Sequence, residues 1–154
     1  MGIMRLPVKN GEAASIDFEH LNRMVDAFIQ AGYHYFDSSY VYHEGKSEEA
    51  LRKAVAERYS REQITIATKF PTFALQEESQ IEPIFTEQLN RLGVEYIDYY
   101  MLHNVQTVLY DGVDGKGGVI QTAHLFDHLK GWKKQGKAKH IGISFHSSAK
   151  VLER

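Results

Sequence analysis

Short apolar runs and amphipathic stretches take turns along this chain. The apolar runs predict strands at residues 3–6, 33–36, 64–68, 96–102 and 139–144. Between them, apolar residues recur every three or four positions, which predicts helices near residues 18–31, 47–57, 82–92 and 123–135, with another starting at Ser148. This strict alternation of strands and helices is typical of a parallel α/β sheet.

Residues that favour helix ends stand at these boundaries. Asp17 and Ser47 are expected to cap the first two helices, because their side-chain oxygens can accept from free backbone N–H groups. Glycines that tolerate a left-handed backbone follow three of the helices: Gly32, Gly93 and Gly136. The order helix, glycine, strand therefore occurs three times. The glycine-rich stretch 104–118 is expected to be a loop.

Both an open doubly wound sheet and a (β/α)8 barrel fit this element order. Polar residues with chemical potential stand at or directly after the ends of four strands: Asp37, Lys69, His103 and Ser144. Both architectures build active sites at that edge. An open sheet usually has a glycine-rich phosphate turn after its first strand, whereas LPVKNGE has a single glycine. We therefore favour a barrel.

Composition restricts the class of protein. The 154 residues are 43% hydrophobic and 25% charged, as in a soluble globular protein, and we expect residues 1–154 to form one α/β domain. A net charge of −2 gives no basic field for nucleic acid or anionic lipid, and the lack of cysteine excludes disulfides and thiolate sites. No apolar run approaches the roughly 18 residues of a membrane helix. The first residues lack the pattern of a secretory leader, so a cytoplasmic location is expected.

The region around the second strand carries the most specific pattern. Asp37 follows an apolar run, and Tyr42 comes five residues later. Tyrosine is a weak acid with a reference pKa of about 10, but an adjacent cation such as Lys69 stabilises a phenolate. Asp37 could pair with that lysine, and His103 could donate a hydrogen bond to a developing oxyanion. These groups suit reduction of a carbonyl, but hydride must come from a nicotinamide cofactor.

Each residue also has a purely structural interpretation. Asp37 could cap a turn, Tyr42 could pack, Lys69 could reach solvent, and His103 could be a hydrogen-bonded core residue. His124 and His128 lie four residues apart on a predicted helix. They lack the accompanying carboxylates of a metal site, so we expect a solvated helix face and no metal.

Several segments together resemble the aldo-keto reductase family. They are MRLP, FDSSYVYHEGKSEEALRKAV, TKF, LGVEYIDYYMLHN and GKAKHIGIS, in the order that the family has. The resemblance implies a (β/α)8 barrel, NADP(H) as cofactor without a metal, and reduction of aldehydes or ketones. By position it implies that Tyr42 is the general acid, tuned by Lys69, and that Asp37 pairs with Lys69. His103 would then orient the small carbonyl substrate, and Ser144 would contact the nicotinamide carboxamide.

Two features depart from the family pattern. Phe145 and His146 follow Ser144 where the family usually has asparagine, which weakens one side of the expected carboxamide contact. A full barrel takes roughly 250 residues, so 154 residues predict only about five βα units and exposed strand edges that could self-associate. A non-catalytic, nucleotide-binding regulatory relative and an inactive half-barrel fragment are therefore the alternatives to an enzyme.

Overall fold

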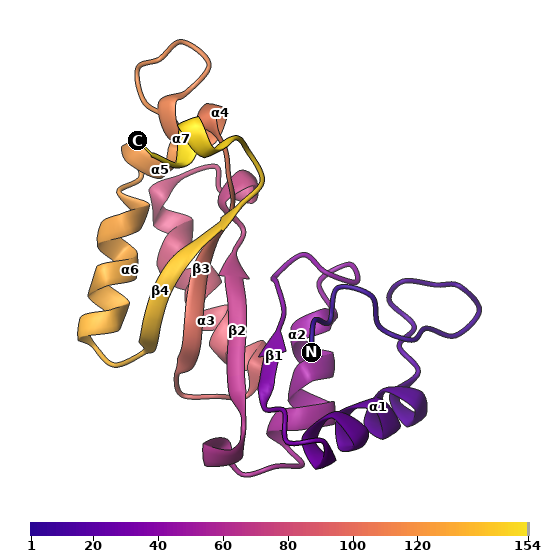
Figure 1. The fold of residues 1–154 in the computed structure, drawn as a ribbon. Coiled ribbons are helices and arrows are strands. Elements are labelled where there is room, and N and C mark those ends of the chain that lie inside the picture. The colour runs from indigo at the N-terminus through magenta and orange to yellow at the C-terminus, as the bar shows by residue number, and fades with distance from the viewer. Residues whose placement is uncertain (154) are drawn as a thin grey trace.

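A parallel four-stranded sheet forms the centre of the computed structural model, which describes residues 1–153 (Figure 1). Its strands are β1 (Tyr35–Asp37), β2 (Thr65–Phe70), β3 (Ile97–Val105) and β4 (Ala138–Phe145), and they lie side by side in sequence order. Every pairing between neighbouring strands is parallel. The predicted parallel α/β architecture is therefore confirmed.

The longer helices follow the predicted order. They are α1 (Phe18–Gln30), α2 (Ser47–Leu51), which continues into a π-helical turn at Arg52–Ala56, α3 (Ile81–Leu92) and α6 (Leu125–Lys134). Shorter helices are α4 (Thr107–Asp111), α5 (Val119–Thr122) and α7 (Ala149–Leu152), and 3₁₀ turns lie at Arg61–Gln63, Thr72–Ala74 and Glu78–Gln80. In Figure 1, α3 and α6 lie along one face of the sheet, and no helix of residues 1–153 covers the other face.

The core lies between the sheet and these helices. Trp132 of α6 is 1% exposed and stacks on Phe85 of α3 with ring centroids 4.1 Å apart. Tyr100 of β3 meets Trp132 edge-on at 5.5 Å. Trp132 is therefore a core residue, because aromatic rings from two helices and one strand fill the same layer.

The uncovered face carries aromatic side chains near the amino ends of the strands. Tyr99 of β3 stacks on His140 of β4 at 4.6 Å and meets Tyr35 of β1 edge-on at 5.6 Å. Tyr99 is 39% exposed and Tyr35 41%. Successive residues of a strand point to opposite faces, so this face receives the alternate positions of each strand.

Helix ends follow the sequence in most places. The Asp17 side chain accepts from the backbone N–H of His20 at 3.1 Å and caps α1, as predicted. Gly93 adopts φ +67° and ends α3. Ser47 does not cap α2, contrary to prediction. It is the first residue of that helix, and its hydroxyl lies 2.9 Å from the Ser38 hydroxyl.

Two other predicted segments differ in the structure. Residues 3–6 form no strand, because pairing is limited to a single bridge between Gly2 and Asp37. The backbone N–H of Leu6 donates to the His43 ring at 2.8 Å, so it is not available to a strand ladder. The stretch 104–118, predicted as a loop, contains the end of β3 and the helix α4. The partial barrel thus has four strands where five were expected.

Candidate active site

Lys69 is the centre of a polar cluster on the uncovered face of the sheet. It lies near the end of β2 and is only 6% exposed. Its ammonium group donates to Asp37 Oδ1 at 2.6 Å and to the backbone oxygen of Ser38 at 2.8 Å. The register pairs Asp37 of β1 with Ala67 of β2. Asp37 and Lys69 therefore both lie near the carboxyl ends of their strands. A buried ammonium ion is tolerated here because it is paired and hydrogen-bonded.

Tyr42 lies in the turn that follows β1, next to Lys69. The Lys69 ammonium nitrogen is 5.1 Å from the centre of the Tyr42 ring. The His103 ring meets the Tyr42 ring edge-on, with centroids 5.7 Å apart and an interplanar angle of 87°. The structure therefore brings together Asp37, Tyr42, Lys69 and His103, which come from three separate segments of the sequence.

The turn behind Tyr42 has an unusual backbone. His43, Glu44 and Gly45 have φ of 52°, 54° and 82°, a left-handed conformation that is costly for the first two. The His43 ring holds this conformation from both sides. Its Nε2 accepts from Leu6 N–H at 2.8 Å, and its Nδ1 donates to the backbone oxygen of Ala13 at 2.7 Å. Sequence reasoning missed this role, because both partners lie 30 or more residues away.

His103 extends from β3 into the same cluster and is 8% exposed. Its Nδ1 lies 2.8 Å from the Ser39 hydroxyl, and the Phe73 ring contacts it edge-on at 5.5 Å. Burial lowers the pKa of His103 to about 4, assisted by the positive charge of Lys69 and by His146, against a smaller opposing effect of Asp37. The imidazole is therefore neutral at pH 7.

Ser144 lies near the end of β4, beside His103 on the neighbouring strand. The register pairs Ile143 with Leu102 and then Phe145 with Val105, so Ser144 lies opposite an irregular stretch of β3 that contains His103 and Asn104. Leu102 is buried on the helix-covered side. Because successive strand residues point to opposite faces, the side chain of His103 points to the uncovered face. The Ser144 hydroxyl is 3.4 Å from His146 Nε2. Of the five residues predicted from the sequence, Asp37, Tyr42, Lys69 and His103 are linked by contacts, and Ser144 lies near the carboxyl end of the next strand without a contact to those four.

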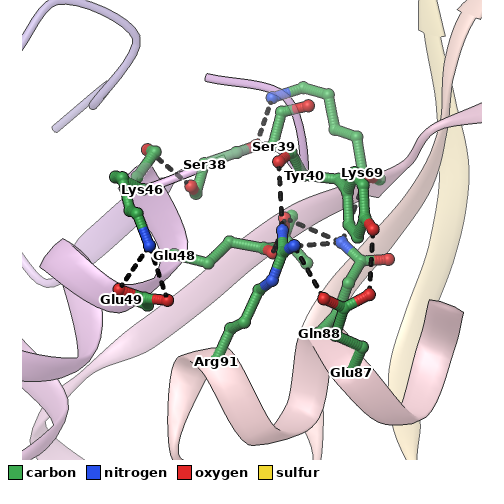
Figure 2. A network of polar contacts seen from close by, with 12 residues as sticks. Ser38, Ser39, Tyr40, Lys46, Glu48, Glu49, Lys69, Glu87, Gln88 and Arg91 are labelled. Carbon is green, nitrogen blue, oxygen red and sulfur yellow. Dashed lines mark hydrogen bonds and ion pairs between the residues drawn. The ribbon is translucent and has the colours of Figure 1, made fainter. Parts of the chain in front are cut away.

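A second polar cluster, on the helix-covered face, contains Glu48 and Gln88 (Figure 2). Glu48 of α2 is fully buried, and its Oε1 accepts from the Thr68 hydroxyl and from Gln88 Nε2, each at 2.6 Å. The Gln88 amide also donates to the backbone oxygen of Lys69 at 3.2 Å and accepts from Tyr100 at 2.6 Å. This cluster therefore touches the backbone of the residue at the centre of the first one.

The charge of Glu48 is only partly compensated. Its Oε2 has no hydrogen-bond partner among the described residues, and the nearest guanidinium nitrogen of Arg91 is 3.7 Å away, beyond hydrogen-bonding distance. Burial therefore raises the pKa of Glu48 to about 7, although its bonds to Thr68 and Gln88 and the charge of Arg91 act in the opposite direction. Glu48 and Gln88 are not among the residues predicted from the sequence. Both stand at apolar positions of amphipathic helices, which is a signal that could have found them.

The edge of the sheet thus offers a phenol, a paired ammonium ion and a neutral imidazole. A separate cavity of about 240 Å³ lies beside the ends of β3 and β4. It is lined by Val105, Thr107, Tyr110, Asp111, Phe126, Ile143, Phe145, Val151 and Leu152. None of the five predicted site residues lines it, so it is a neighbouring feature and not the centre of the chemistry.

Two other features of the described residues bear on function. No group of three metal-ligating side chains occurs in residues 1–153. His128 instead lies 3.7 Å from the carboxylates of both Glu78 and Glu82, while His124 precedes α6. In the same part of the chain, no helix has the length and apolar character needed to cross a membrane.

Comparisons of the sequence give a consistent set of relatives. The sequence profile described as Aldo/keto reductase family matches residues 1–154. An aldo-keto reductase of Mycobacterium tuberculosis is 27% identical over 139 residues, which cover 90% of this chain and 45% of that protein. The protein REDOX 2 of Catharanthus roseus is 33% identical over 137 residues, covering 81% of this chain and 41% of that protein.

Solved structures share the fold. An aldo-keto reductase of Bacillus halodurans in its holo form superposes with a TM-score of 0.70 at 25% identity, over 99% of this chain and 47% of that one. An aldo-keto reductase of Bombyx mori in complex with NADP has a TM-score of 0.66 at 24% identity, over 93% and 45% of the two chains. The matched proteins are (β/α)8 barrels. This chain spans about half of their length, so its fold is a partial barrel.

Proposed function

Because this chain belongs to the aldo/keto reductase family, we propose that it supplies the catalytic residues of an NADP(H)-dependent oxidoreductase that reduces an aldehyde or ketone. The chain spans about half the length of its relatives, so the proposal concerns the chemistry that these residues can perform. The observation that carries it is the position of Lys69, which bonds Asp37 at 2.6 Å and lies 5.1 Å from the Tyr42 ring centre. A structural lysine would not need a phenol beside its ion pair.

In this proposal Tyr42 donates the proton to the carbonyl oxygen while the carbonyl carbon is reduced. Lys69 stabilises the phenolate that remains, because a cation next to the ring favours its charged form. Asp37 holds the lysine in place and balances its charge. The Tyr42 hydroxyl has no hydrogen bond to any residue within 1–153, so it is available to a substrate.

His103 would polarise the same carbonyl. The neutral imidazole carries one N–H, which can donate to the oxygen as negative charge develops on it. A cationic imidazole beside Lys69 would raise repulsion, and burial of the ring disfavours that form. Donation by a neutral group also leaves Tyr42 as the proton source.

The residues present fit the nicotinamide end of NADP(H), which supplies the hydride when bound. Ser144 presents a hydroxyl at the same edge of the sheet as His103, where it could bond the carboxamide. Solved relatives support this cofactor, since a Bombyx mori structure contains NADP and a Klebsiella pneumoniae structure contains NADPH. Self-association through exposed strand edges stays a prediction.

The proposal is tested by replacing Tyr42 with phenylalanine. We expect turnover of NADPH with an aldehyde panel to fall about 10²–10⁴-fold, because the general acid is lost. Calorimetric titration with NADPH should give an unchanged affinity, because the phenol is not part of the proposed cofactor contact. Tyr40→Phe is the matched control, since Tyr40 lies two residues away and its hydroxyl bonds Glu87 at 2.8 Å.

The outcomes separate the alternatives. Turnover that survives Tyr42→Phe would show that the proposed acid is wrong. Saturable NADPH binding by the parent chain without any turnover would favour a non-catalytic nucleotide-binding relative. Neither binding nor turnover would mean that this polypeptide alone is an inactive half-barrel.

A further inference from the structure

A buried serine hydroxyl contacts the back of the His103 ring. Ser39 follows β1 by two residues and is fully buried. Its hydroxyl oxygen lies 2.8 Å from Nδ1 of His103, across 64 residues of sequence. The proposed chemistry uses the imidazole but gives Ser39 no role.

A neutral imidazole has a single N–H, on either Nδ1 or Nε2. His103 is neutral at pH 7, because burial and the charge of Lys69 keep its pKa at about 4. The nitrogen that carries the hydrogen therefore decides what the ring can do. Only the form with hydrogen on Nε2 can donate from the side of the ring that faces away from Ser39.

Aromatic neighbours do not make this choice. The Tyr42 and Phe73 rings lie edge-on to the imidazole at 5.7 and 5.5 Å, which limits how the ring can rotate. Neither ring forms a hydrogen bond to a ring nitrogen of His103. The selection between the two forms must then come from the group bonded to Nδ1.

The partners available to the Ser39 hydroxyl decide which of the two groups donates in this hydrogen bond. Within residues 1–153, the Ser39 hydroxyl has no hydrogen-bond partner other than His103. If Nδ1–H donated to the serine oxygen, the hydroxyl hydrogen would be buried without an acceptor, which is unfavourable. If the hydroxyl donates to Nδ1, both groups are satisfied.

We infer that Ser39 is a positioning residue that donates its hydroxyl hydrogen to Nδ1 of His103 and thereby holds the hydrogen of the imidazole on Nε2. This N–H is then presented to the carbonyl oxygen of the substrate, a step that rests on the proposed function. The assignment of the hydrogen to Nε2 is a property of the chain alone. It can be examined whether or not the chain turns over a substrate.

The test is long-range ¹H–¹⁵N NMR of the histidine side chains at pH 7.5. The chain has eight histidines, and the His103 signals are identified by their loss in His103→Asn. The parent chain should show a hydrogen on Nε2 and a hydrogen-bonded, unprotonated Nδ1 at His103. A hydrogen on Nδ1 in the parent chain would overturn the inference without any variant being needed.

The variants Ser39→Ala and Ser39→Thr show whether the hydroxyl is the cause. Ser39→Ala should move the His103 signals toward a mixture of both forms, and Ser39→Thr, which keeps a hydroxyl, should restore the Nε2 form. Ser38→Ala is the matched control. Ser38 is equally buried, but its hydroxyl bonds Ser47 and not the imidazole, so the His103 signals should stay unchanged.

If the parent chain reduces an aldehyde, steady-state kinetics provide a second measurement of the role of Ser39. Ser39→Ala should lower kcat about tenfold and leave the KM for NADPH unchanged, since only the donor to the carbonyl is disturbed. An Nε2 form that persists fully in Ser39→Ala would overturn the role of the serine. A parent chain without turnover would contradict the proposed function, while the NMR result would still decide the inference.

Discussion

Thr68 and Lys69 are consecutive residues of β2, yet they lie in two buried polar clusters with opposite properties. Thr68 faces the helices and donates to Glu48, and Lys69 faces the uncovered side and donates to Asp37. The alternation of a strand alone separates them. Each cluster leaves one group without a hydrogen-bond partner in residues 1–153. In the helix-side cluster it is Glu48 Oε2, which is fully buried, and in the open cluster it is the hydroxyl of the half-buried Tyr42.

Burial and a shifted pKa do not by themselves distinguish a reactive polar cluster from a structural one. Glu48 is more deeply buried than Lys69 and has a strongly shifted pKa, two features that often mark catalytic groups. However, its neighbours Thr68, Gln88 and Tyr100 are all fully buried, so no substrate can reach it. Access, more than the size of a pKa shift, identifies the side of β2 that can perform chemistry.

The largest expected effect comes from removing the lysine of the open cluster. Lys69→Met should lower turnover about 10³-fold, which corresponds to about 4 kcal/mol of transition-state stabilisation. The fold should persist, because the Asp37 side chain is 30% exposed and can be hydrated once its partner is gone. Steady-state kinetics and far-UV circular dichroism measure the two results.

The neighbouring residue provides the matched control for that variant. Thr68→Val keeps the shape of the side chain but removes the donor to Glu48, so we expect a loss of about 1–3 kcal/mol in unfolding free energy. Turnover should change little, because the altered group faces the helices. If Thr68→Val impaired turnover as strongly as Lys69→Met, the separation of the two clusters by function would be wrong.

Much of the open cluster could be predicted because it depends on local features. Strand ends are visible in the apolar pattern, and parallel strands bring their carboxyl ends to one edge, so Asp37, Lys69 and His103 could be grouped without coordinates. The roles assigned to them came from the chemistry of the side chains and from a family resemblance. Those roles stay predictions, although the structure places Asp37, Lys69 and His103 close to Tyr42 or to one another.

The missed features all depend on which hydrogen-bond partner a polar group finds in the folded chain. Leu6 reads as a strand residue, but the ring of His43 takes its N–H group. Ser47 reads as a helix cap, but its hydroxyl meets Ser38 within the core. Ser39 reads as a turn residue, and only the position of β3 brings it to His103. Local pattern cannot show which of several hydrogen-bond partners a polar side chain selects in the folded chain.

Glu48 offers the next largest test of the comparison. Its pKa is raised to about 7 in the folded chain, mainly by burial, so ionisation of this group costs stability as the pH rises from about 4.5 through 7. Glu48→Gln keeps an oxygen that can accept from Thr68 and Gln88 but carries no charge. Relative to the parent, the variant should gain up to about 3 kcal/mol between pH 5 and pH 8.

Urea denaturation of both proteins across this pH range measures the difference. Glu48→Ala is the control for size, and we expect it to be less stable than the parent at every pH, because the donors of Thr68 and Gln88 lose their acceptor. A stability difference between Glu48→Gln and the parent that does not change with pH would contradict the buried, partly compensated charge.

The smallest effect is expected at His103, and it has the opposite sign. Its pKa is about 4 when folded against 6.5 as a free side chain, so the unfolded chain binds the proton more readily between these values. The stability that depends on the neutral ring is complete above pH 6.5 and is lost as the pH falls toward 4. We expect a loss of about 1–2 kcal/mol, less than the pKa shift alone implies, because the ring borders the uncovered face.

His103→Asn should remove this part of the pH dependence of stability, as measured by urea denaturation. The contribution of Glu48, which has the opposite pH dependence, should remain. If the parent and His103→Asn lost stability equally on acidification, the imidazole would not be held neutral by Lys69 and burial, and the open cluster would lack its neutral donor.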